Sequence, residues 1–218
     1  MDRHEKAALV LDALIFAFTI FATVTLIIGL DFMEDLRNLT GLNLKCFRYF
    51  TTDSNIFAAF VALVDIAFLI SKKRSTVMYC FKLAAVTGLT LTMLVTVFFL
   101  APRSKTTYLA YFMNSNFFMH LITPLLFIIT FVFFDNSRKP PFKLTFTGII
   151  PMAIYSLFYT PNIILHLDNG KIDPDYDWYG FLAGGLNTIW FVYPLIFFLT
   201  WIFSLGLWAL NRKFSANN

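Results

Sequence analysis

Residues 117–134 read Phe-Phe-Met-His-Leu-Ile-Thr-Pro-Leu-Leu-Phe-Ile-Ile-Thr-Phe-Val-Phe-Phe, an apolar run with a single ionisable side chain, His120. About 20 mostly apolar residues form a helix long enough to cross the hydrocarbon core of a bilayer. The run therefore predicts a membrane-spanning helix. An ionisable ring at this depth is costly and rare, which makes His120 a candidate functional residue.

Five further apolar runs occur in the chain. Together with the first, they predict spans at about 8–30, 53–71, 79–101, 117–134, 144–166 and 187–210. The 218 residues are 58% hydrophobic and include 28 phenylalanines, a composition typical of membrane proteins rather than of water-soluble domains. We therefore predict an all-α integral membrane protein, in which residues 1–218 form a single domain, a bundle of six transmembrane helices.

The basic residues are divided unequally between the two sets of loops. If the N-terminus is cytoplasmic, the inner face holds Arg3, Lys6, Lys72, Lys73, Arg74, Arg138, Lys139, Lys143, Arg212 and Lys213. The outer face then holds Arg37, Lys45, Arg48, Arg103, Lys105 and Lys171. Because an excess of Lys and Arg marks the cytoplasmic side, both termini are predicted to be cytoplasmic. The net charge of +4 is assigned to these loops, and no nucleic-acid partner is expected.

Several polar residues are predicted to lie at one depth near the outer face. At 1.5 Å per helical residue, Thr51 lies roughly 31 Å and His120 roughly 27 Å from the inner basic residues. Side chains lean toward the N-terminus of a helix, which lifts the imidazole toward the depth of Thr51. The polar residues gathered at this level are Thr51, Thr52, Asp53, Ser54, Asn55, Asn116, His120 and His166.

Helical spacing narrows this set, since Thr51 and Asn55 share one helix face, as do Asn116 and His120. A hydroxyl and an imidazole in one cavity can act as nucleophile and general base, while nearby amides stabilise an oxyanion.

The same residues also have structural interpretations that compete with the catalytic one. Thr51 and the three residues after it can simply cap the second span. His120 can be an interhelical hydrogen-bonding residue, and His166 an ordinary interfacial residue.

A second polar group is predicted nearer the cytoplasm, where Asp12, Asp65 and Lys82 lie inside apolar runs. Buried carboxylates need partners, and Lys82 can neutralise one of them. Two interpretations follow. The group can relay protons or ions, or a salt-bridged pair can fix the packing of the helices; the second is favoured.

Three segments resemble, in order, motifs of a known membrane family. They are Arg48-Tyr-Phe-Thr51, the segment Asn116-Phe-Phe-Met-His-Leu-Ile-Thr-Pro124, and, more weakly, Asp177-Trp-Tyr-Gly-Phe181. The family is that of the androgen-induced membrane proteins, multi-pass hydrolases of fatty-acid esters of hydroxy fatty acids. The Ser54-Asn55 pair resembles the shorter bacterial branch. The resemblance implies a catalytic threonine and histidine, which fall on Thr51 and His120.

We therefore expect an intramembrane hydrolase of lipid or fatty-acyl esters, in which Thr51 attacks the carbonyl and His120 accepts its proton. Amide donors to the oxyanion and a group that orients the imidazole complete the expected site. The candidates are Asn55 and Asn116 for the first role, and Asp53 and His166 for the second. The reaction requires no metal or cofactor, and the composition suggests a bacterial plasma membrane.

Two alternatives stay open at this point. The chain can be a small transporter or channel that uses the polar group of Asp12, Asp65 and Lys82 together with His120. It can also be a lipid-binding membrane protein without catalytic activity.

Overall fold

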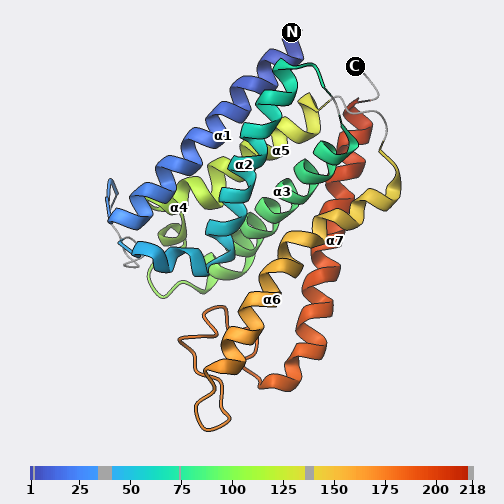
Figure 1. Cartoon of the computed structure of the whole chain (residues 1–218). Coiled ribbons are helices and arrows are strands. Elements are labelled where there is room, and N and C mark those ends of the chain that lie inside the picture. The colour runs from blue at the N-terminus through green and yellow to red at the C-terminus, as the bar shows by residue number, and fades with distance from the viewer. Residues whose placement is uncertain (2, 34–40, 74, 136–139, 216–218) are drawn as a thin grey trace.

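The computed structural model describes residues 1, 3–33, 41–73, 75–135 and 140–215. Six helical stretches in these ranges are long and apolar enough to cross a membrane: Arg3–Ile28, Phe50–Ile70, Thr76–Arg103, Ser115–Phe134, Phe142–Leu165 and Leu186–Phe214. The predicted six-helix transmembrane bundle is confirmed (Figure 1). Arg37, Arg74, Arg138 and Lys139, which contribute to the charge count, lie outside the described residues.

Two spans are continuous α-helices, α1 (Arg3–Ile28) and α2 (Phe50–Ile70), and the others combine several segments. The third comprises α3 (Thr76–Val95), a π turn (Thr96–Leu100) and a 3-10 turn (Ala101–Arg103). The fourth comprises α4 (Ser115–Phe117), the π turn η5 (Phe118–Ile122), α5 (Thr123–Ile129) and the π turn η6 (Thr130–Phe134). The fifth joins the 3-10 helix η7 (Phe142–Ile149) to α6 (Ile150–Leu165), and the sixth joins η8 (Leu186–Thr188) to α7 (Ile189–Ser215). Short 3-10 helices, η1 (Asn43–Arg48) and η4 (Tyr108–Phe112), precede the second and fourth spans.

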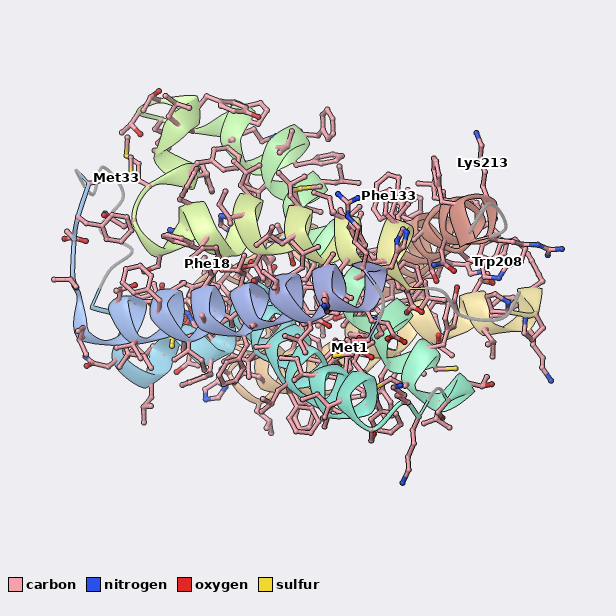
Figure 2. The ribbon with its side chains drawn as sticks, turned by 90° about the horizontal axis from the view of Figure 1, so that it is seen from above. Met1, Phe18, Met33, Phe133, Trp208 and Lys213 are labelled. Atoms are coloured by element: carbon pink, nitrogen blue, oxygen red, sulfur yellow. The ribbon has the colours of Figure 1, made fainter. Side chains whose placement is uncertain are left out.

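Both chain termini lie at one end of the bundle, here called the terminal end (Figure 1). Figure 2 shows Met33 and Lys213 on opposite sides of the molecule. The third span is central, with 61% of its most apolar window buried, whereas the corresponding value for the sixth is 17%. The sixth span therefore presents most of its surface to lipid. Which end faces the cytoplasm stays a prediction.

A glycine allows η7 to approach its neighbours closely. A Cβ atom on Gly148 would lie 2.8 Å from the Thr87 hydroxyl oxygen of α3 and would collide with Ser204 of α7. The Ser204 hydroxyl donates to the Thr145 carbonyl at 2.7 Å, and the Trp201 indole donates to the Thr145 hydroxyl at 3.1 Å. These contacts hold the last two spans against α3.

Candidate functional site

The first turn of α2 contains Thr51. The helix begins at Phe50, its N-cap residue is Tyr49, and no side chain caps it from that position. Thr51 to Ser54 therefore lie inside the helix, and the interpretation that these residues serve as its N-cap is wrong. An acidic residue in a first turn, here Asp53, interacts favourably with the helix dipole.

The start of α2 has no capping side chain of its own. Tyr179, from the connection between the last two spans, supplies a hydrogen-bond acceptor there instead. Its hydroxyl oxygen accepts the backbone N–H of Phe50 at 2.9 Å and also interacts with the hydroxyl and the backbone of Thr51. Burial raises the pKa of Tyr179, and these hydrogen bonds oppose the shift only in part. Tyr179 is therefore a neutral phenol in direct contact with the candidate nucleophile.

The segment 177–181 is fixed in place by α6. The Asp177 carboxylate accepts hydrogen bonds from the Tyr159 hydroxyl and, at 2.9 Å, from the backbone N–H of Leu182. The Trp178 indole donates to the Tyr155 hydroxyl at 3.0 Å, and this hydroxyl donates to the carbonyl of Arg48 at 2.7 Å. The chain before α2, the segment 177–181 and α6 thus form one hydrogen-bonded unit.

Arg48 adds aromatic contacts to this unit. Its guanidinium carbon lies 4.8 Å from the centre of the Tyr49 ring and 5.3 Å from that of Trp178, within range of cation–π attraction. The same side chain donates to the Tyr49 hydroxyl at 2.6 Å. Arg48 is exposed, so its positive charge lies at the outer edge of the site.

Asn55 joins the start of α2 to the segment that carries His120. Its side-chain amide donates to the carbonyl of Thr51 at 2.8 Å and to the carbonyl of Met119 at 3.1 Å. Asn55 is fully buried, so both bonds are shielded from water. This bridge brings the threonine segment beside the histidine segment.

His120 lies in the π turn η5, and only 6% of it is exposed. Pro124 explains the wide turn, because proline has no N–H for the carbonyl four residues earlier, which is that of His120. The ring nitrogen Nδ1 lies 2.9 Å from the carbonyl oxygen of Tyr111. A carbonyl only accepts hydrogen bonds, so in the neutral ring Nδ1 carries the proton and Nε2 is the basic nitrogen. Single π turns inside helices are frequent at functional sites.

The three segments that carry the family resemblance thus meet around the first turn of α2. Tyr179 contacts Thr51 directly, and Asn55 connects Thr51 to the residue before His120. Within the described part of the chain, no hydrogen bond joins the Thr51 hydroxyl directly to the His120 ring.

The other predicted site residues are dispersed. His166 is exposed at the end of α6, where its ring stacks on Tyr176 with centroids 3.8 Å apart and its Nδ1 contacts the carbonyl of Asn162 at 2.8 Å. Asp53 lines a groove on another face of α2, and Asn116 is half-buried in α4. The structure brings Asn55 to the threonine and histidine segments but does not bring His166 there.

An apolar groove of about 830 Å³ runs between α2, α3 and α6. Its lining includes Phe57, Phe81 and Ile154, while Arg48 and Asp53 are its charged residues. The volume falls within the range of small-molecule sites. Neither Thr51 nor His120 lines the groove, although Phe50 and Asp53, which lie in the same helical turn as Thr51, do.

Asn114 is a structural residue that the sequence reasoning missed. It has a positive φ of 50°, a value that residues other than glycine rarely adopt. Its side-chain oxygen accepts the N–H groups of Phe32 and Met33 at 2.9 and 2.7 Å. Asn114 therefore ties the chain after α1 to the start of the fourth span.

The second polar group is a buried charge cluster near the terminal end. Lys82 contacts Asp65 at 2.7 Å, as the sequence allowed, and also Asp135 at 3.1 Å, a partner that sequence reasoning missed. Asp12 is fully buried and interacts electrostatically with all three. Asp12, Asp65, Lys82 and Asp135 together form the charge cluster. Among the described residues no group of His, Cys, Asp and Glu has the arrangement of a metal site.

Removal of the Asn55 amide is expected to destabilise the site. In Asn55→Ala the buried carbonyl of Met119 loses its donor, which costs about 1–3 kcal/mol of unfolding free energy. Unfolding of the purified protein in detergent, followed by circular dichroism, measures the loss. Asn116→Ala, at a half-buried position, serves as control and should change this energy by less than about 0.5 kcal/mol. Equal losses in the two variants would contradict the bridging role.

Comparison with protein-family models, with curated proteins and with solved structures found no significant match. The resemblance to the androgen-induced membrane proteins therefore stays a prediction from the quoted motifs.

Proposed function

We propose that this integral membrane protein hydrolyses lipid esters within the bilayer, with Thr51 as nucleophile and His120 as general base. The convergence of residues 48–51, 116–120 and 177–181 on the first turn of α2 is the observation that carries the proposal. These segments are far apart in sequence and are the same three that resemble the hydrolase family. The tautomer favoured by the Tyr111 carbonyl, with a basic Nε2, suits a general base.

The reaction proceeds in two steps. The Thr51 oxygen attacks the ester carbonyl carbon, its proton passes to Nε2 of His120, and the C–O bond to the alcohol breaks as the alcohol takes up that proton. Water, deprotonated by His120, then attacks the carbonyl carbon of the acyl-threonine. The bond to the Thr51 oxygen breaks as that oxygen takes the proton from His120, and the fatty acid is released. The approach of Thr51 to His120 tightens when substrate binds, as is common for catalytic hydrogen bonds.

Tyr179 is the proposed hydrogen-bond donor to the oxyanion. Its oxygen accepts the backbone N–H of Phe50 and interacts with Thr51, and the neutral phenol retains its own proton to donate. The amide nitrogen of Asn55 already binds two carbonyls, so we assign Asn55 a positioning role instead. The oxyanion would thus form beside the start of α2, where the positive end of the helix dipole also favours it.

The groove supports a substrate with one long acyl chain. Its lining is apolar, it lies within the membrane-spanning part of α2, α3 and α6, and its charged residues include Arg48 beside the first turn of α2. We place the acyl chain in this groove and the ester at the level of Thr51. The natural setting that fits the composition and the loop charges is a bacterial plasma membrane with both termini cytoplasmic.

A covalent probe tests the proposal. Purified protein in lipid nanodiscs, treated with an alkyl fluorophosphonate, should carry the adduct on Thr51, as identified by peptide mass spectrometry. Thr51→Val removes the hydroxyl with little change in shape and should abolish labelling, whereas Thr51→Ser should retain it. Labelling that persists in Thr51→Val, or no labelling of the wild-type protein, would overturn the assignment of the nucleophile.

The groove also favours a second candidate, a lipid-binding protein without catalytic activity, because Thr51 and His120 do not line it. This candidate predicts that a lipid copurifies with the protein and that no adduct forms at Thr51. Bulky substitution in the groove, such as Ala84→Trp, would then reduce the amount of retained lipid. If the protein is a hydrolase, the same Ala84→Trp substitution would instead raise its KM for long-chain esters.

A further inference from the structure

The two charged residues that line the apolar groove between α2, α3 and α6 have opposite signs. They are Arg48 and Asp53. Within the described part of the chain, no ion pair or hydrogen bond joins them. Opposite charges in apolar surroundings attract each other strongly. Two such charges that stay unpaired in one groove are therefore each available to a group of the opposite sign on a ligand.

Aromatic contacts hold the Arg48 guanidinium in place. It lies over the rings of Tyr49 and Trp178, and it donates one hydrogen bond to the Tyr49 hydroxyl. A guanidinium has five N–H donors in a planar fork that matches the oxygens of a phosphate. Arg48 thus offers its other donors to an anion, at the end of the bundle where α2 begins (Figure 1).

The Asp53 carboxylate is available to a cation. Asp53 is half-buried, and its side chain has no hydrogen bond or ion pair within the described part of the chain. Partial removal from water without a partner is unfavourable for a carboxylate. Tyr155 lines the groove within electrostatic range of Asp53, and aromatic rings attract ammonium groups. A ligand with an ammonium group would supply the missing charge.

The hydroxyl groups that line the groove are already satisfied. They belong to Ser54, Thr147, Tyr155 and Tyr159, and each donates to an oxygen atom of the protein. These groups have less to offer a ligand than Arg48 and Asp53 have. The two charged residues therefore determine which polar head the groove accepts.

The length of the groove suits an acyl chain. Its lining residues on α6 extend from Ile150 to Asn162, a distance of about 18 Å along the helix. Half of the hydrocarbon core of a bilayer is roughly 15 Å thick. The groove therefore follows one acyl chain through a whole leaflet, while a second chain can stay in the surrounding bilayer.

We propose that this groove binds an ethanolamine phospholipid, a lipid whose head carries a phosphate and a primary amine. Arg48 binds the phosphate, Asp53 binds the ammonium group, and one acyl chain lies along α6. An ammonium with N–H donors forms charge-assisted hydrogen bonds to a carboxylate, whereas the quaternary amine of choline has no N–H to donate. Asp53 repels lipids that carry a phosphate without an amine.

The same lipid is the substrate class that suits the proposed hydrolysis, and this part of the inference rests on the proposed function. The ester bonds of a glycerophospholipid adjoin its head, and Thr51 lies in the same helical turn as Asp53. Attack of Thr51 on one ester, followed by water, would release one fatty acid. The other product would be the phospholipid with a single acyl chain.

Lipid affinities measured by native mass spectrometry test the proposal. The full-length Thr51→Val protein in detergent is used, so that no lipid is consumed. The lipids are phosphatidylethanolamine, phosphatidylglycerol and phosphatidylcholine with identical acyl chains. We expect phosphatidylethanolamine to bind about tenfold more tightly than either of the others, which corresponds to about 1.4 kcal/mol. Equal affinity for phosphatidylethanolamine and phosphatidylglycerol would overturn the proposal.

Two further substitutions assign the head groups. Asp53→Asn should bring the affinities for phosphatidylethanolamine and phosphatidylglycerol within about twofold of each other, and Arg48→Gln should weaken both by about tenfold. The matched controls are Lys45→Gln and Asp175→Asn, which remove exposed charges outside the groove and should leave the affinities unchanged. A preference that persists in Asp53→Asn, or equal effects of Arg48→Gln and Lys45→Gln, would contradict the assignment.

The outcome is separate from that of the covalent probe. If the fluorophosphonate labels Thr51 but the lipids bind equally, the lipid assignment is wrong and the hydrolysis is unaffected. If phosphatidylethanolamine is preferred but Thr51 is not labelled, the binding site stands and the nucleophile does not.

Discussion

A Lys82→Met variant is expected to lose about 3–5 kcal/mol of unfolding free energy, the typical cost of removing one partner from a buried ion pair. Lys82 is the common partner of Asp65 and Asp135, and its ammonium group also attracts Asp12. Without it, these buried carboxyl groups have no compensating charge. The ion pairs of Lys82 connect three separate spans. Their loss is therefore expected to destabilise the whole bundle rather than one helix.

Unfolding in mixed micelles with increasing denaturing detergent, followed by circular dichroism, measures this loss. Lys143→Met removes an exposed lysine near the same end and should change the stability by less than about 0.5 kcal/mol. Addition of Asp65→Asn to Lys82→Met should restore part of the stability, because one uncompensated carboxylate is removed. If Lys82→Met is as stable as the wild-type protein, the ion pairs do not hold the spans together.

The second large effect is expected on catalysis. His120→Gln should lower the turnover of a long-chain nitrophenyl ester by about 10²–10⁴-fold, the usual contribution of a general base. Glutamine can still approach the Tyr111 carbonyl through its amide, but it cannot accept a proton from Thr51. The measurement is the initial rate in nanodiscs, and the folded state is checked by size-exclusion chromatography.

His166→Ala is the matched control for this variant. His166 is exposed, and its contacts are with Asn162 and Tyr176 at the end of α6. Its replacement should leave the rate within about twofold of the wild-type value, since exposed positions away from the chemistry contribute little. A similar loss of rate in both variants would exclude a specific role of His120.

The spans are predictable from the sequence because long apolar runs have one low-energy arrangement in a bilayer, the helix. The fourth span, predicted at 117–134, is observed at Ser115–Phe134. The first begins at Arg3 rather than at residue 8, since the polar residues of its first turn are good helix formers that hydropathy overlooks. Hydropathy detects the membrane core, whereas caps and charges determine the true ends.

The site is predictable only where its contacts are local in the sequence. Thr51 and Asn55 share a face at helical spacing, and the structure adds a hydrogen bond between them. The contacts of Tyr179 with α2 and of Asp135 with Lys82 join distant segments, so no periodicity indicates them. The role of Tyr179 as a hydrogen-bond partner of α2 becomes visible only once the spans are assembled.

The hydrogen bond from the start of α2 to Tyr179 has a consequence for biosynthesis. Chains are made from the N-terminus, and early segments fold while later ones are still being synthesised. The surroundings of Thr51 therefore stay incomplete until residue 179 has left the ribosome and the fifth helix has entered the membrane. A nascent chain that ends after the fourth helix would contain both Thr51 and His120 yet would remain inert toward lipid.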